Sequence, residues 1–168
     1  MIHLARKLVL ILVLACGGTV GAQTLDTPKG KVVLTVGGQI GVKNKGTAAV
    51  FDMAMLEKLP QSTFTTKTPW DNQPVKFSGP LLRDVLDAVQ AKGNTIKAIA
   101  LNDYKISIPA EDARKFGVVM ALKMDDKAIP VRTKGPLFIV YPFDSAKELQ
   151  SATYYERSIW QLKAVELE

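Results

Sequence analysis

The sequence has almost no cysteine or histidine: Cys16 and His3 are the single examples of each, and both lie near its start. From residue 17 onward the chain therefore has no pair of thiols for a disulfide and no thiolate or imidazole to bind a metal. It also lacks the side chain that most often serves as a general base, and the thiol nucleophile. Most hydrolase and redox mechanisms are excluded for this part of the chain.

A short basic and then apolar start predicts a secretory signal peptide. Arg6 and Lys7 precede the apolar run 8–15, and the small residues at 20–22 suit cleavage before Gln23. The apolar run is too short to span a membrane, so no transmembrane segment is predicted.

The domain organisation follows from this start. We expect residues 1–22 to be removed and residues 23–168 to form one periplasmic domain with a single core. A lipid anchor at Cys16 is the alternative, because the residues around it loosely resemble a lipobox. The formal net charge of the whole chain is +6, but its lysines are scattered and form no stripe typical of nucleic-acid binding.

Strands dominate the predicted elements. Alternating or β-branched apolar patterns predict strands at 31–37, 62–68, 96–100, 106–108, 118–124, 135–143 and 158–168. Helices are predicted at 50–59, with Asp52 as N-cap, at 80–93, with Pro80 in the first position, and as a short turn at 109–117. Residues 146–157 are expected to be irregular. The pattern indicates a β-rich α+β domain with mixed sheets.

Several short motifs carry a family resemblance through their order and spacing. They are "FSGPLLRDVLDAV", "IKAIALNDYKISIPAEDA", "VVMALKMDDKAIPVRTKGPLFIVYPF" and "SIWQLKAVEL". This series resembles the molybdopterin-binding domain of the sulfite oxidase superfamily, over about residues 30–167. The resemblance implies the fold of that superfamily and a pterin-type ligand.

One departure from the family bears on chemistry. The family's metal is held by a cysteine before the long helix, where this chain reads "STFTTKTPWDN". Soft thiolate ligands suit a molybdenum centre, so its absence indicates a pterin bound without molybdenum and without catalysis. The chain is similar to small exported pterin-binding proteins that act as periplasmic partners of membrane receptors controlling cyclic-di-GMP.

Pterin chemistry selects the candidate ligand-binding residues. The ring has a flat face for aromatic side chains, a donor edge that matches one carboxylate, and an acceptor edge for basic or hydroxyl groups. Trp70 with Trp160 or Tyr155 is expected to sandwich the ring, beside Tyr104. Asp103 or Glu156 is expected to bind the donor edge. The candidates for the acceptor edge are Arg132, Lys134, Arg157 and Ser158.

Several of these candidates also have a purely structural interpretation. Asp103 follows Asn102 between two predicted strands, where both residues suit a hairpin turn. Trp160 alternates with Leu162 and Ala164, as a core residue of a strand would. Single basic residues are most often solvated.

Three functions remain open from the sequence. The favoured one is a non-catalytic pterin-binding protein that signals to a membrane receptor. The first alternative is a molybdopterin-dependent oxidoreductase or an accessory subunit of one. The second is an interaction scaffold without a small ligand.

Overall fold

The computed structural model describes residues 24–168. The predicted signal peptide, 1–22, and the alternative anchor, Cys16, lie outside the described residues. Within the described part of the chain, no helix is both long and apolar enough to cross a membrane.

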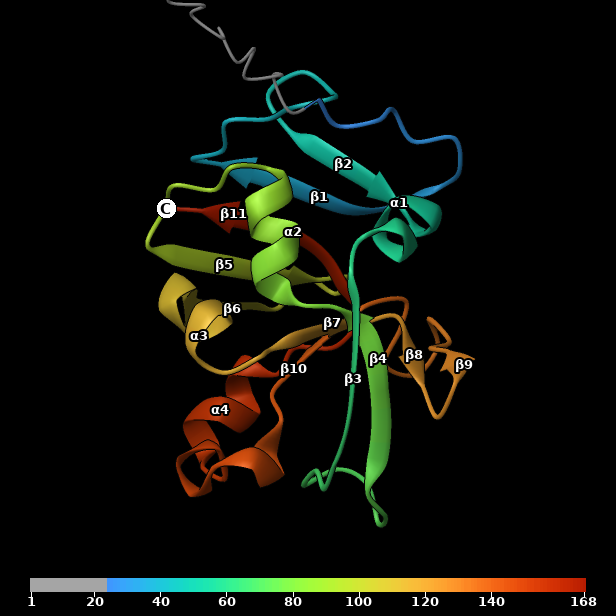
Figure 1. Cartoon of the computed structure of the whole chain (residues 1–168), viewed down its shortest axis with the longest axis vertical. Coiled ribbons are helices and arrows are strands. Elements are labelled where there is room, and N and C mark those ends of the chain that lie inside the picture. The colour runs from blue at the N-terminus through green and yellow to red at the C-terminus, as the bar shows by residue number, and fades with distance from the viewer. Residues whose placement is uncertain (1–23) are drawn as a thin grey trace, which may run out of the picture.

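A five-stranded mixed sheet forms one side of the molecule (Figure 1). Its order is β2 (Ala49–Asp52), β1 (Val32–Gly38), β11 (Leu162–Leu167), β5 (Thr95–Ala100) and β6 (Lys105–Pro109). The strands β1 and β11 are parallel and every other neighbouring pair is antiparallel. The helix α2 (Leu82–Ala88) lies across one face of this sheet.

Two smaller sheets form the other side. One has the order β3 (Gln61–Thr66), β4 (Val75–Pro80), β8 (Lys123–Met124) and β9 (Lys127–Ala128), and the other pairs β10 (Phe138–Val140) with β7 (Val119–Ala121). The remaining helices are α1 (Met53–Lys58), α3 (Ala110–Lys115) and α4 (Ala152–Arg157), with 3-10 turns η1 (Phe143–Ser145) and η2 (Lys147–Leu149). The predicted β-rich α+β class is confirmed.

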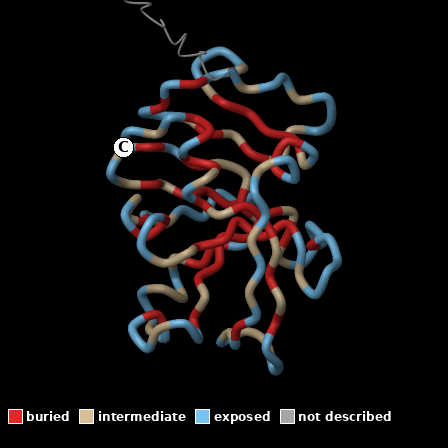
Figure 2. The backbone as a smooth tube through the Cα atoms, viewed as in Figure 1, coloured by how far each residue is buried: buried red, intermediate tan, exposed pale blue. Residues whose placement is uncertain are grey.

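The core lies where the sheets meet and under α2 (Figure 2). The predicted apolar face of α2 is buried, including Leu82, Val85 and Leu86. Large aromatic side chains fill the space between the sheets, among them Phe77 and Phe138, whose rings meet edge to face at 5.6 Å. Burying these surfaces is the main favourable term in folding.

Asp52 caps α1 as the sequence predicts. One carboxylate oxygen accepts the Met55 N–H at 2.9 Å, and the other accepts the N–H groups of Lys29 and Gly30 at 2.8 and 2.7 Å. These backbone bonds, that from Gly30 foremost, hold the pKa of Asp52 below its usual value. One side chain therefore fixes both the start of α1 and the chain entering β1.

The helix predicted from Pro80 to Gly93 is shorter than expected. Pro80 is the last residue of β4, paired with Gln61, and α2 spans Leu82–Ala88. The apolar periodicity was correct, but tertiary pairing extends the preceding strand to the proline. The Leu82 N–H donates to the Val118 carbonyl at 2.8 Å, which anchors the start of the helix to the chain entering β7.

Other boundaries also differ from the predictions. Residues 146–157, expected to be irregular, contain η2 and α4. The predicted strands at 135–143 and 158–168 shorten to β10 and β11, and residues 49–52 precede α1 as a strand. Trp160 consequently lies before β11, where Gln161 has a φ of +51° that breaks the strand alternation.

We expect Gly79→Ala to lower the free energy of unfolding by about 2–3 kcal/mol, as overpacking does. A Cβ at position 79 would lie 2.1 Å from the Met120 carbonyl oxygen, because β4 passes very close to β7. Urea unfolding would measure the loss. Gly37→Ala is the matched control, since a Cβ there would come no nearer than 4.0 Å to its closest neighbour. Equal stability of the two variants would contradict the steric argument.

Candidate functional site

A cavity of about 340 Å³ lies between the β5–β6 turn, α4 and the chain entering β11. This volume falls in the range of small-molecule pockets. The residues that line it are Trp70, Ala100, Asn102, Tyr104, Tyr155, Glu156, Ser158, Ile159, Trp160 and Gln161. Six of the ten predicted ligand-binding residues are therefore brought together: Trp70, Tyr104, Tyr155, Glu156, Ser158 and Trp160.

The cavity is built on a cluster of aromatic rings centred on Trp70. The Trp70 ring lies 5.3 Å from Trp160, 6.2 Å from Tyr155, 6.0 Å from Phe138 and 6.1 Å from Phe143. Trp70 thus joins the pocket to the core. The Pro69–Asp71 loop that carries it is held locally, because the Thr68 hydroxyl accepts the Trp70 N–H at 3.2 Å and donates to Asp71 at 2.8 Å.

The rings expected to sandwich the ligand lie nearly perpendicular to one another. Trp70 meets Trp160 at an interplanar angle of 89° and Tyr155 at 76°, in edge-to-face contact. Perpendicular rings in contact leave no parallel slot between them. A flat ligand can instead lie against one exposed ring face, and Trp160 is 37% exposed.

Glu156 supplies the one carboxylate among the described residues that line the cavity. It lies on α4, which ends where the Ser158 N–H and hydroxyl bond back to the Tyr154 carbonyl at 3.1 and 2.9 Å. These bonds fix the turn that leads from Glu156 to Trp160. The carboxylate and the exposed indole are therefore positioned by the same short segment.

Asp103, the second predicted carboxylate, lies outside the lining. It has a φ of +66° in the β5–β6 turn, and its N–H donates to the Ala100 carbonyl at 3.0 Å. Its carboxylate accepts the Lys163 ammonium at 2.6 Å, and this bond holds the pKa of Asp103 below its usual value. The geometry favours the interpretation of Asp103 as a turn residue.

The three predicted basic residues also lie outside the lining. Lys134 binds both carboxylate oxygens of Asp71 at 2.7 Å, and both residues line a separate cavity of about 560 Å³. Arg132 is exposed on the loop before it. Arg157 turns away from the cavity and donates to Asp112 at 2.9 Å.

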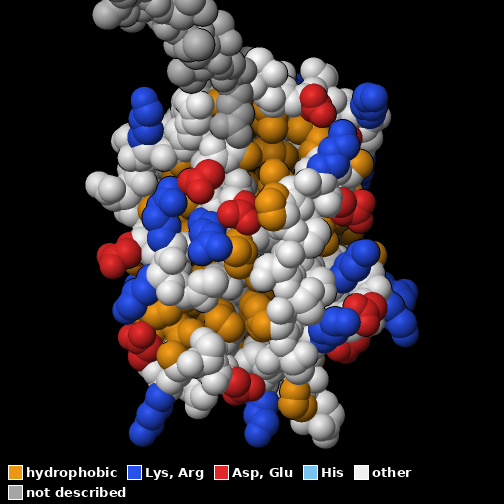
Figure 3. Space-filling model, in the orientation of Figure 1, with side chains coloured by type: hydrophobic (Ala, Val, Ile, Leu, Met, Phe, Trp, Pro, Cys, Tyr) orange, Lys and Arg blue, Asp and Glu red, His pale blue; other side chains and the backbone are white. Residues whose placement is uncertain are grey.

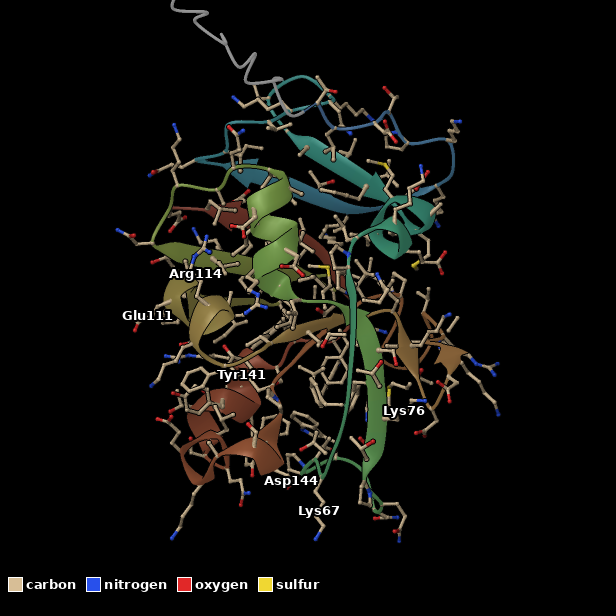
Figure 4. The ribbon with its side chains drawn as sticks, in the orientation of Figure 1. Lys67, Lys76, Glu111, Arg114, Tyr141 and Asp144 are labelled. Atoms are coloured by element: carbon tan, nitrogen blue, oxygen red, sulfur yellow. The ribbon has the colours of Figure 1, made fainter. Side chains whose placement is uncertain are left out.

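The pair formed by Arg157 and Asp112 belongs to a largely buried network beside the pocket. Asp112 also accepts the Tyr141 hydroxyl at 2.7 Å, and Tyr141 lies between α3 and α4 (Figure 4). Burial, together with the bond to Asp112, raises the pKa of Tyr141 well above its usual value. The network ties α4, which carries Tyr155 and Glu156, to α3.

Four lining residues were not among the predicted site residues: Ala100, Asn102, Ile159 and Gln161. Asn102 accepts the Tyr104 N–H at 3.1 Å through its side-chain oxygen, which leaves its amide NH₂ as a donor toward a ligand. The sequence signal that could have identified Asn102 as a lining residue is its place in the predicted Asn102–Asp103 turn. No sequence signal marks Gln161, whose side chain donates to the Val131 carbonyl at 2.8 Å.

The donor set fits a pterin ring and does not fit a thiolate-bound metal. The cavity offers aromatic faces, one carboxylate, two side-chain amides and three hydroxyls. In residues 24–168, no group of three or more His, Cys, Asp or Glu is placed to hold a metal ion. In the threonine-rich stretch before the long helix, buried Thr66 uses its hydroxyl to accept the Asp144 N–H at 3.0 Å.

The surface charge in view is mixed. On the face drawn in Figure 3, basic and acidic side chains alternate without one large block of either sign. Such a distribution is typical of a solvated surface rather than of a nucleic-acid interface.

Comparison with known proteins places this fold in a family. A search of curated proteins finds no match. The family model described as the oxidoreductase molybdopterin binding domain matches residues 26–157, which include nearly all the elements described above. The resemblance read from the sequence motifs is thereby confirmed. The chain belongs to the family of oxidoreductase molybdopterin-binding domains.

Proposed function

We propose that this chain is an exported, non-catalytic pterin-binding protein that reports ligand occupancy to the periplasmic domain of a membrane receptor controlling cyclic-di-GMP. The observation that carries the proposal is the cavity itself, with its aromatic wall and single carboxylate and without a thiolate. Family membership supports a pterin-type ligand. The missing soft ligand supports binding without molybdenum.

The lining suggests how a pterin would be held. Its ring lies against the exposed face of Trp160, and the Glu156 carboxylate accepts two parallel hydrogen bonds from the donor edge. The Asn102 amide donates to the acceptor edge. Contact with one aromatic face adds about 0.5–1.5 kcal/mol beyond burial, so the paired carboxylate supplies most of the selectivity.

Exposed apolar side chains at and beside the cavity support a protein partner. The large hydrophobic side chains that are exposed in the described chain are Leu101, Tyr104, Val131 and Trp160. Gln161, next to Trp160, connects the segments that carry Leu101 and Val131. Its carbonyl accepts the Leu101 N–H at 2.8 Å, and its side-chain amide donates to the Val131 carbonyl at 2.8 Å. Grouped exposed apolar residues mark interaction sites. A receptor that docks here contacts both the rim and the bound ring, so its affinity depends on occupancy.

We expect Glu156→Gln to weaken pterin binding at least tenfold, because it removes a charged acceptor of two hydrogen bonds worth about 1.5–3 kcal/mol. Titration with unsubstituted pterin, followed by its fluorescence, would measure the change. Asp103→Asn is the matched control and should retain affinity, since Asp103 is bound to Lys163. Loss of pterin binding in the Asp103 variant alone would show that Asp103, in the β5–β6 turn, binds the donor edge of the pterin instead of Glu156.

The alternative function is a molybdopterin-dependent oxidoreductase, or an accessory subunit of one, which family membership favours. Protein purified from its producing cell would be denatured and assayed for released pterin fluorescence and for molybdenum by mass spectrometry. Pterin without metal is the expected result. Molybdenum with pterin would favour the oxidoreductase, and failure to bind any added pterin would leave the ligand-free scaffold.

A further inference from the structure

The outer edge of β3 is open along most of its length. β3 pairs with β4 from Gln61 opposite Pro80 to Thr66 opposite Val75, and it ends the order of its sheet. In Figure 1 β3 lies at the front of the molecule beside β4. Six residues of extended backbone are thus paired on one side alone.

The pairing pattern identifies the free backbone groups. The carbonyls of Lys76 and Ser78 accept bonds from Asp125 and Leu122 on the β8 side. Because bonding direction alternates along a strand, Ser62, Phe64 and Thr66 bond to β4, and the N–H and C=O groups of Gln61, Thr63 and Thr65 point outward.

The end of this edge is closed. The next outward N–H, that of Lys67, donates to the Asp144 carboxylate at 2.8 Å, and the two residues lie together in Figure 4. The open stretch is therefore confined to residues 61–65.

The terminal strands β2, β6 and β9 of the two larger sheets are protected, and β3 is not. All four residues of β2 are buried, β6 begins with Lys105 and ends with Pro109, and β9 has only two residues, one of them Lys127. β3 carries no charged residue and reads QSTFTT. Charge, proline and short length are the usual protections against strand pairing, so their absence marks β3 as a pairing edge.

We propose that β3 pairs antiparallel with the β3 of a second copy, about a two-fold axis at Thr63. A two-fold interface brings the same patch of both copies together. This register sets Thr63 opposite the partner's Thr63 and Gln61 opposite the partner's Thr65, so the outward groups of both strands bond to each other. Facing threonines form favourable cross-strand pairs.

The residues flanking the edge favour a second copy as the occupant. Phe64 is half-buried against Phe77, with ring centroids 6.0 Å apart. The register brings Phe64 diagonal to the partner's Phe64, within reach of an aromatic contact. Continued past the strand, the same register sets Lys67 of one copy level with the partner's Leu59, which follows Glu57 and Lys58 in the sequence.

The test uses protein expressed from the full-length sequence and sedimentation velocity over a concentration series. Wild type is expected to form a dimer. Thr63→Lys and Thr63→Glu, each alone, place like charges opposite each other and should weaken the dimer at least tenfold. An equimolar mixture of the two variants should restore a dimer, because opposite charges then face each other.

Matched variants keep this result specific. Gln73→Lys and Gln73→Glu change the same charges on an exposed loop and should leave the dimer intact. Thermal unfolding of every variant shows that it is folded. A monomeric wild type at its highest soluble concentration would overturn the proposal. So would unweakened dimers of both Thr63 variants, or variants whose mixture stays monomeric.

Discussion

Replacing Asp112 with alanine is expected to lower the free energy of unfolding by about 2–4 kcal/mol, somewhat less than breaking a fully buried ion pair from one side, because the Arg157 side chain is partly exposed. Asp112 is 6% exposed and accepts hydrogen bonds from both Arg157 and Tyr141. Without it, a guanidinium that is 22% exposed and a buried hydroxyl lose their acceptor. Urea unfolding monitored by circular dichroism would measure the change.

Asp87→Ala is the matched control for this prediction. Asp87 also pairs with an arginine, Arg114, at 2.7 Å, but the two side chains are 54% and 60% exposed. Exposed pairs contribute about 0–1 kcal/mol, so this variant should be nearly as stable as wild type. A comparable loss in both variants would show that burial does not determine the cost.

The Asp112 network also bears on ligand binding. Arg157 and Glu156 are neighbours in α4, and the helix sends the first toward α3 and the second to the cavity. Asp112→Asn keeps an acceptor for the Tyr141 hydroxyl but removes the negative charge opposite Arg157. Its stability would therefore separate the contribution of the hydrogen bond from that of the ion pair. We place Asp112 as a positioning residue for α4, because it acts on the pocket only through that helix.

Local chemistry allowed much of the fold to be predicted. Asp52 capped α1, the Asn102–Asp103 turn joined β5 to β6, and the apolar stripe of α2 was buried. Each of these signals acts over a few residues. Pro80 shows the limit, because its place at the end of β4 depends on pairing with Gln61 across the sheet.

The cavity lining was less predictable, because several candidate side chains bind partners that are distant in the sequence. Lys134 pairs with Asp71 and Asp103 with Lys163, separated by 63 and 60 residues in the sequence. Periodicity cannot show such pairs, and a lysine or aspartate already bound is less available to a ligand. Most candidates on one short segment, from Tyr155 to Trp160, line the cavity together because the chain itself holds them close.

Trp70→Ala is expected to cost about 3 kcal/mol of stability and also to abolish pterin binding, whereas Trp160→Ala should mainly affect binding. Trp70 contacts four aromatic rings, so its loss opens a cavity in the core as well as in the pocket.

The effect of Trp160→Ala follows from its exposure. Trp160 is 37% exposed, so we expect a stability loss of about 1 kcal/mol and a pterin affinity reduced about twofold to tenfold, the range for one aromatic contact. Trp160→Phe keeps a ring face and should recover part of that affinity. Thermal unfolding and pterin titration of the three variants would separate the two roles. If Trp160→Ala bound pterin as wild type does, the ligand would have to lie against Tyr155 or Tyr104 instead, and the exposed indole would be left to the partner protein.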